Sequence, residues 1–204
     1  MERFELNFFK TEMRVWLFSE VKNGGGLKKA LVEASRSKDA AEQRRLDWAF
    51  LDASMITSLQ HLVTAVCQAL VSRSHGSLKT KTLHSEILWT LSPGSNIMEA
   101  IKTFGIGDQT SALLLVKLQP MEAGADDEGE KEDVDEAARR LVDGRLVSLD
   151  QLGKSTTINW KALRRLYKLN EDPVIKELAG DDVKLHAMMD QIITSTVALK
   201  SVAA

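Results

Sequence analysis

A glycine-rich segment is the first feature of this chain with residues suited to ligand chemistry. Asn23-Gly24-Gly25-Gly26 follows a short apolar run and precedes Leu27-Lys28-Lys29, a place where exposed amides at a helix start attract phosphate. The segment lacks the second glycine followed by Lys and Ser or Thr of a P-loop, and it lacks the three spaced glycines of a dinucleotide fingerprint. We therefore interpret it as a turn in which Asn23 caps the next helix.

Metal and nucleophile chemistry have little support in the sequence. The four histidines show no ligand spacing, and Cys67 is six residues from His61, off its helical face. No Gly-x-Ser-x-Gly elbow marks a nucleophile, although a triad scattered along the chain stays open. Glu86 is interpreted as a capping or dipole partner near a helix start. The sequence therefore predicts a binding protein and not an enzyme, with no cofactor and no metal.

Composition narrows the class of protein further. A chain of 204 residues that is 44% hydrophobic can build one sizeable core, so we expect a single domain over residues 1–204. The single cysteine excludes an intrachain disulfide and indicates a reducing compartment, with Cys67 a buried and inert thiol. Neither a basic-then-apolar leader nor an apolar run of about 18 residues is present, which predicts a soluble intracellular protein with no membrane partner.

Charge is unevenly distributed along the chain. Residues 122–136 contain nine acidic side chains and one lysine, a local charge of -8, whereas the rest of the chain carries +6. The acidic stretch, at about residues 120–136, has almost no apolar residues and is predicted to be a disordered loop. The remainder is mildly basic, which is compatible with an RNA backbone as partner but is also common on solvated surfaces.

Hydrophobic periodicity predicts an α/β (α+β) fold. Strands are expected at Phe4–Phe9, Met13–Phe18, Thr110–Leu118 and Arg145–Val147, and a further run, Leu46–Leu51, ends at Asp52. Helices are expected at 27–35, 55–70, 87–91, 96–104, 159–169, after Pro173 and after Asp181 or Asp182, with a polar loop over 36–45. The first two strands should pair antiparallel, and Thr110–Leu118, which is apolar without a break, should be central. We predict a mixed sheet of four or five strands with helices packed against it.

Two helices carry apolar faces of different character. The stripe on Met55–Leu70 is assigned mainly to the core. The carboxy-terminal helix combines methionines with branched residues, and methionine suits a surface that conforms to a partner. For this helix, a partner-binding face and docking on the core both stay open.

The residue order between Ser77 and Gly105 is specific enough to compare with known families. Lys79-Thr80-Lys81-Thr82 leads into an apolar run with Glu86 in its first turn, which stops at Leu91-Ser92-Pro93 before a second helix closes on Phe104-Gly105. This stretch resembles the PRPK-binding protein family (TPRKB-like), the kinase-associated subunit of the KEOPS (EKC) complex. The resemblance covers nearly the whole chain, leaving out the acidic loop and part of the loop before Leu46.

The resemblance implies a role in tRNA modification. Members of the family are non-catalytic subunits that bind the N-lobe of the small atypical PRPK kinase. The ATPase of this kinase supports a separate threonylcarbamoyl transferase, and the complex installs threonylcarbamoyladenosine beside the anticodon of tRNA. The resemblance thus implies direct binding to the kinase, indirect association with the transferase, and residence in nucleus and cytoplasm. It also implies contact with tRNA, including its 3′ end, and a primarily tRNA-binding role stays open as the alternative.

Physical arguments locate these two contacts on the sequence. Kinase binding is assigned to one side of the carboxy-terminal helix, with Met55–Leu70 as second candidate; the assigned residues are Leu185, Met188, Met189, Ile192 and Ile193. Contact with tRNA is assigned to Arg73, Lys79, Lys81, Ser92 and Asn96. The basic side of the 159–169 helix is an alternative footprint for RNA, with Lys161, Arg164, Arg165 and Lys168.

Overall fold

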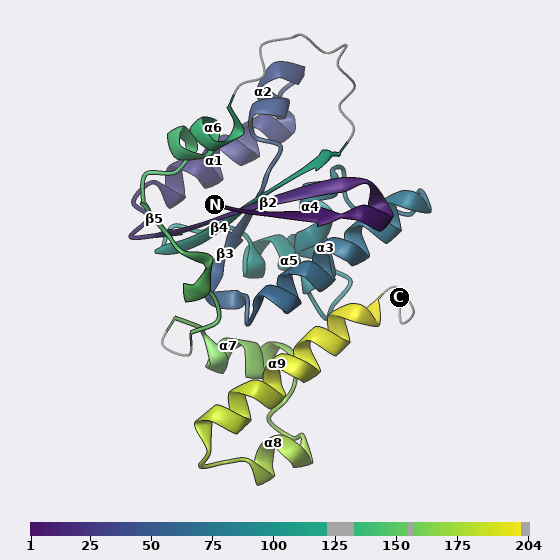
Figure 1. Ribbon diagram of the computed structural model, residues 1–204, viewed down its shortest axis with the longest axis vertical. Helices are drawn as coiled ribbons and strands as arrows, with labels where there is room; N and C mark the ends of the chain where they lie inside the picture. Colours follow the sequence, from purple (N-terminus) through teal and green to yellow (C-terminus); the bar gives the residue numbers. More distant parts are fainter. Residues whose placement is uncertain (122–132, 155–156, 201–204) are drawn as a thin grey trace. The chain divides into compact units, whose positions relative to one another are not determined.

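The computed structural model describes residues 1–121, 133–154 and 157–200 of the chain (Figure 1). Contacts divide the chain into two compact units, with unit 1 formed by Met1–Asp52 and Gly105–Gln151, and unit 2 by Ala53–Phe104 and Leu152–Ala204. The predicted fold class is confirmed, because the units together hold one five-stranded sheet and several helices. None of the described helices is long and apolar enough to cross a membrane.

The sheet lies in unit 1. Its strands are β1 (Glu2–Leu6), β2 (Thr11–Ser19), β3 (Ala49–Asp52), β4 (Ala112–Pro120) and β5 (Arg145–Val147). They follow the order β1-β2-β4-β3, and β5 pairs with the end of β2 beyond β1. Every strand pairing among the described residues is antiparallel, where the sequence analysis expected a mixed sheet. The predicted central position of the Thr110–Leu118 run is confirmed, since β4 lies between β2 and β3.

One face of the sheet is covered by the helices of unit 1. These are α1 (Gly24–Arg36), α2 (Ala40–Arg45) and α6 (Val134–Leu141), which Figure 1 shows together beside the strands. Alternate residues of β2 and β4 point to this face, because side chains of a strand alternate between its two sides. Trp16 and Leu115 are fully buried there, and the Trp16 Nε1–H donates to Asp135 at 2.7 Å. Burial of this face fixes the register of the long β2–β4 pair.

Unit 2 is helical in its described part. Its helices are α3 (Leu59–Ser74), α4 (Leu83–Leu91), α5 (Ile97–Phe104), α7 (Trp160–Leu166), α8 (Pro173–Glu177) and α9 (Asp182–Ala198). Two of these helices begin at side-chain caps: Thr82 and Ser85 form a capping box on α4, and Asp181 accepts from the Lys184 N–H on α9. Pro173 opens α8, where a missing N–H costs nothing.

Several sequence-based boundaries need correction. The expected loop over 36–45 contains α2, capped by Asp39, and residues 7–9 form a short 3-10 helix, not strand. The Asn23 side chain makes no cap bond and instead joins α6 to the turn, donating to Leu141 O and accepting from the Asp143 N–H. At the margins of the predicted disordered loop, β4 continues to Pro120 and Asp133 caps α6. The rest of that loop, residues 122–132, lies outside the described residues.

Two sequence-based predictions for unit 2 also need correction, the start of α3 and the burial of Cys67. Met55 and Ile56 precede α3 and are buried, so the helix begins only at Leu59. Cys67 is half-buried, not fully enclosed, and this partial burial raises the pKa of the thiol. A raised pKa leaves little thiolate at neutral pH, which is consistent with an unreactive side chain.

A polar network fixes the start of α3. His61 is fully buried, and its Nδ1 accepts from the Thr57 N–H at 3.3 Å, which requires a neutral ring. The Thr57 hydroxyl donates to Asp190 of α9, and the Ser58 hydroxyl donates to the same carboxylate at 2.9 Å. Burial lowers the pKa of His61 to about 3. The histidine is therefore a structural, uncharged member of the core.

This network predicts how stability depends on pH. Unfolded His61 takes up a proton near pH 6.5 and folded His61 only near pH 3, so stability is lost as pH falls through this window. The expected slope from this residue is up to about 1.4 kcal/mol per pH unit. Urea unfolding at several pH values should show a weaker dependence for His61→Gln than for the parent chain. Exposed His75→Gln is the control, and an unchanged slope in His61→Gln would contradict the assignment.

Candidate functional site

The carboxy-terminal helix α9 divides its apolar residues between core and surface. Met189 and Ile193 are 1% and 0% exposed, so the structure places these two predicted kinase contacts in the core. Leu185, Met188 and Ile192 are half-buried on the flanks of that stripe. A partner can therefore reach three of the five assigned residues without disturbing the packing of the helix.

Helix α9 is held in place by polar bonds as well as by packing. Asp190 accepts from the Thr57 and Ser58 hydroxyls at the start of α3. Near the other end of α9, the Gln68 side chain of α3 donates to Ala198 O at 2.7 Å. Of the two alternatives that the sequence left open, docking on the core is thus confirmed for this face. The flanks and the opposite side, where Val183 is 81% exposed, are the available surface.

A pocket of about 380 Å³ lies between α7 and α9. It joins residues from both earlier assignments, because the predicted kinase contacts Leu185 and Met189 line it together with basic residues of the alternative RNA footprint. The complete lining is Trp160, Lys161, Arg164, Arg165, Asn170, Leu185, His186 and Met189. The pocket combines an apolar wall with three cations, which suits a partner segment carrying both apolar and acidic or phosphate groups.

Two aromatic rings form one side of this pocket. Trp160 and His186 stack with their centroids 4.2 Å apart and their planes 7° from parallel. The Trp160 Nε1 and the Arg164 Nε are buried and have no hydrogen-bond partner among the described residues. An unpaired buried donor costs free energy that an acceptor from a partner would recover. His186 belongs to no motif, so no sequence signal pointed to this pair.

The five residues assigned to tRNA do not form one cluster. Lys79 and Lys81 are exposed on the loop that enters α4, whereas Ser92 and Asn96 follow its other end. Nine helical residues separate the two groups, a span of about 13 Å at the helical rise of about 1.5 Å per residue. Arg73 is exposed in the last turn of α3. Of the five assigned residues, only Lys79 and Lys81 thus lie together on one exposed segment. We call this segment, before α4, the lysine loop.

Glu86 shapes this lysine loop. Its side chain is completely buried and accepts from the Lys79 and Thr80 N–H groups at 3.0 Å and 2.8 Å, and from the Thr80 hydroxyl at 2.7 Å. These bonds agree with the structural role expected from the sequence. With its backbone fixed, the loop presents the Lys79 and Lys81 side chains to solvent.

The other end of α4 is organised by a residue that the sequence analysis missed. The Lys200 ammonium donates to the backbone oxygens of Trp89 and Ser92 and, at 2.9 Å, to that of Gly94. It also lies 3.8 Å from the centroid of the Trp89 ring. Ser92 is 5% exposed and its hydroxyl accepts from the Gly94 N–H, while the Asn96 side chain accepts from the Glu99 N–H. Both predicted phosphate ligands thus support the local turn.

Two opposing effects act on the pKa of Lys200. Burial lowers its pKa to about 8, and the negative charge of Glu86 acts in the opposite direction. At neutral pH the ammonium is therefore still mostly protonated, and three carbonyl oxygens at the end of α4 stabilise it. The helical pattern does not predict this role of Lys200, because the residue follows α9 and its partners are backbone atoms.

The second candidate for kinase binding, Met55–Leu70, is largely core. In α3 the buried residues are His61, Leu62, Ala65, Val66, Ala69, Leu70 and Ser72. Leu62, Val66, Ala69 and Leu70 belong to the predicted apolar stripe, whereas Leu59 and Val63 of that stripe are only half-buried. Only the opposite side of α3 is left for a partner.

The sequence of this chain was compared with known protein families and proteins. Residues 18–201 match the family model described as "Kinase binding protein CGI-121". The chain is 31% identical to the "EKC/KEOPS complex subunit CGI121" of Gibberella zeae, over 92% of this chain and 91% of that protein. It is also 31% identical to the protein of the same name from Yarrowia lipolytica, over 79% and 82%. A relative from Schizosaccharomyces pombe is 27% identical over 85% and 91%.

The Lys200 contacts predict a measurable contribution to stability. Lys200→Met keeps the length of the side chain but removes the ammonium, so the Ser92 and Gly94 oxygens lose their donor in a mostly buried site and the Trp89 oxygen keeps only the Ser92 N–H. We expect a loss of about 2–4 kcal/mol in the free energy of unfolding, measured by urea denaturation. The control is Lys184→Met, whose exposed ion pair with Asp181 should contribute less than about 1 kcal/mol. Equal losses in both variants would show that Lys200 has no special role.

Proposed function

This chain belongs to the CGI-121 family of kinase-binding proteins, and we propose that it is a non-catalytic subunit of an EKC/KEOPS complex. In this role it binds the small PRPK-type kinase of the complex directly and stimulates the ATPase of that kinase. The threonylcarbamoyl transferase is reached indirectly, through the kinase, and the product is threonylcarbamoyladenosine beside the anticodon of tRNA. The observation that carries the proposal is the match over nearly the whole length of both the chain and its relatives.

The accessible side of α9 is the proposed contact for the kinase. Leu185, Met188 and Ile192 combine exposed apolar area with adaptable side chains, which is the character of a hydrophobic hot spot. The pocket beside them adds the cations Lys161 and Arg165, both exposed, which favour an acidic rim on the partner. Because α9 is already fixed to α3, little ordering cost opposes association.

The first test is co-purification of the chain with the PRPK-type kinase of the same organism. A stoichiometric complex and an increased ATPase rate, with and without tRNA, are the expected results. Failure to form the complex would contradict the proposal. Complex formation without stimulation would remove only the activating role.

A single substitution on α9 tests the proposed contact. Ile192→Glu introduces a charge on the half-buried flank and should weaken kinase binding by at least about tenfold, since the carboxylate would be desolvated in an apolar contact. Binding is measured by isothermal titration calorimetry and folding by circular dichroism. The matched control is Gln191→Glu, which places the same charge on the adjacent exposed position. Equal affinity of both variants would move the contact away from this flank.

A second candidate function is tRNA binding, favoured by the exposed lysine loop. Lys79 and Lys81 have no acidic partner among the described residues, and Glu86 holds their backbone in a defined shape. Paired cations on a fixed loop suit successive phosphates of an RNA strand. The 3′ end of tRNA, which is single-stranded, is the proposed ligand in this alternative.

The lysine loop yields a prediction about salt dependence. Lys79→Glu combined with Lys81→Glu should weaken tRNA binding and reduce the slope of log K against log salt by about 1.5–2, because two phosphate contacts are lost. Filter binding at several salt concentrations measures both quantities. Lys22→Glu with Lys29→Glu makes the same change in net charge on exposed positions of unit 1 and serves as control. Unchanged binding in the first pair, with the kinase complex intact, would exclude this loop.

A further inference from the structure

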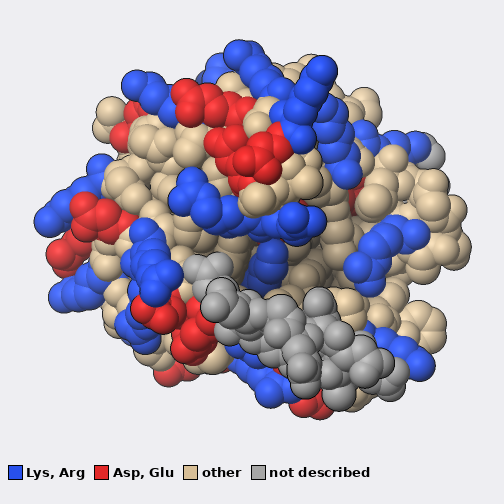
Figure 2. Space-filling model, turned by 90° about the horizontal axis from the view of Figure 1, so that it is seen from above, with Lys and Arg blue, Asp and Glu red and all other residues tan. Residues whose placement is uncertain are grey.

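A second pocket, in unit 1, has no part in the proposed function. It has a volume of about 320 Å³ and lies between the end of α2, β4 and α6. Its lining consists of four cations and four apolar residues: Arg44, Arg45, Lys117, Arg140, Trp48, Val134, Ala137 and Leu141. Figure 2 shows the molecule from the side on which α2 and α6 lie in Figure 1, and Lys and Arg side chains border a hollow there.

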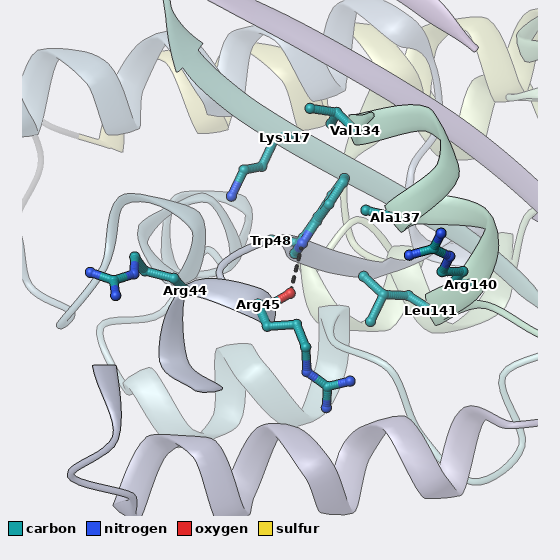
Figure 3. A pocket seen from close by; sticks show the side chains of 8 residues that line it. All are labelled: Arg44, Arg45, Trp48, Lys117, Val134, Ala137, Arg140 and Leu141. Carbon is teal, nitrogen blue, oxygen red and sulfur yellow. Dashed lines mark hydrogen bonds between the residues drawn. The ribbon is translucent and has the colours of Figure 1, made fainter. Parts of the chain in front are cut away.

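The pocket has a cationic side and an apolar side. Figure 3 shows Arg44 and Lys117 on one side of Trp48, the α6 residues on the other, and Arg45 below the ring. Apart from Arg140, which pairs with Glu136, the α6 wall is apolar, because Ala137 and Leu141 follow one another at four-residue spacing on the helix. No lining residue is acidic. A ligand that fills this space must therefore offer negative charge to one side and apolar surface to the other.

The four cations differ in what they already bind. The Lys117 Nζ donates to Asp47 O at 2.7 Å and lies 5.1 Å from the centroid of the Trp48 ring, and the Arg140 guanidinium pairs with Glu136 at 2.5 Å. Arg44 and Arg45, in contrast, are exposed and make no ion pair with any described residue. Each of these two unpaired guanidinium groups offers donors with the fork geometry that a carboxylate accepts in pairs.

The aromatic ring in the pocket does not provide a stacking platform. Trp48 is only 7% exposed; Lys117 occupies one face, and Trp16 packs edge-on at 5.4 Å between centroids. The Trp48 Nε1–H is also used, since it donates to Arg45 O at 3.0 Å. Single-stranded nucleic acid is bound in large part by stacking of bases on open aromatic faces. The enclosed ring and the apolar α6 wall favour a peptide over a nucleotide.

From this arrangement we infer that the unit 1 pocket binds a short acidic peptide segment of a partner protein, with an apolar residue beside its carboxylates. Arg44 and Arg45 hold the carboxylates, and the apolar side chain packs on Ala137 and Leu141. Lys117, fixed against Asp47 O and Trp48, supplies a positive charge at the base of the pocket. The inference is independent of kinase and tRNA binding, because none of the residues proposed for those contacts lines this pocket.

The test uses the full-length chain and a fluorescein-labelled probe peptide of sequence Asp-Leu-Glu-Asp-Phe-Glu. Fluorescence anisotropy should show saturable binding that weakens with salt, and Arg44→Gln with Arg45→Gln should reduce the affinity at least tenfold. Both side chains are exposed and unpaired, so the variant should keep the melting temperature of the parent chain. The matched control is Arg36→Gln with Arg139→Gln, which removes two exposed cations of unit 1 that do not line the pocket.

Three further probes distinguish the ligand classes. A peptide with Asn and Gln in place of the acids tests the charge, a peptide with Ser in place of Leu and Phe tests the apolar wall, and a single-stranded oligonucleotide of six uridines tests the nucleic-acid alternative. The inference requires at least tenfold weaker binding of the first two probes. Equal binding of the parent chain and the Arg44 and Arg45 variant would overturn it. It would also be overturned if the oligonucleotide bound more tightly than the acidic peptide through the same arginines.

Discussion

The pairing of β3 with β4 is the constraint on which the arrangement of the chain depends. The chain leaves unit 1 after Asp52 and returns at Gly105, and all of Ala53–Phe104 lies between these two points. Leu51 forms a bridge with Gly105, and Asp52 accepts from the Thr110 hydroxyl at 3.0 Å. Closing so long a loop costs entropy that grows only slowly with length, and the burial of Leu51, Leu113 and Leu114 offsets it. A short strand pair thus permits an inserted helical segment without loss of the sheet.

The same principle of local closure recurs in unit 2, where buried polar groups hold loops in place. Glu86 accepts from the loop before α4, Lys200 donates to the carbonyl oxygens after it, and Asp190 ties α9 to the start of α3. Each of these charged groups is satisfied mainly by backbone atoms or hydroxyls, because an unpaired buried charge would be costly. Glu86, Lys200 and Asp190 therefore act as structural ties in the described part of unit 2. This use is consistent with the proposed non-catalytic role.

Elements with a strong local pattern were predictable from the sequence, and contacts between distant segments were not. Thr82, Pro173 and Asp181 mark helix starts by their own chemistry, and the apolar run of β4 revealed its central place. The stripe on α9 was visible, but periodicity alone cannot tell which of Met188 and Met189 faces the core. Ser92 was predicted as a phosphate ligand because serine often binds phosphate. The structure shows instead that Ser92 is buried at the end of α4, where its carbonyl oxygen accepts from Lys200. Pockets require residues from several elements, so neither could be read from one segment.

The basic side chains fall into two groups, those that already bind atoms of the fold and those that face solvent. Lys117 and Lys200 are partly or largely buried, both have pKa values lowered by burial, and both donate to backbone oxygens, so their charges are already engaged. Arg44, Arg45 and the lysine loop carry charges that no described carboxylate compensates. A net charge of only -2 hides this distinction, since it counts engaged and available cations alike. A basic residue indicates a binding surface when solvent, and not the fold, is its present partner, because only then does a ligand bring it a new interaction.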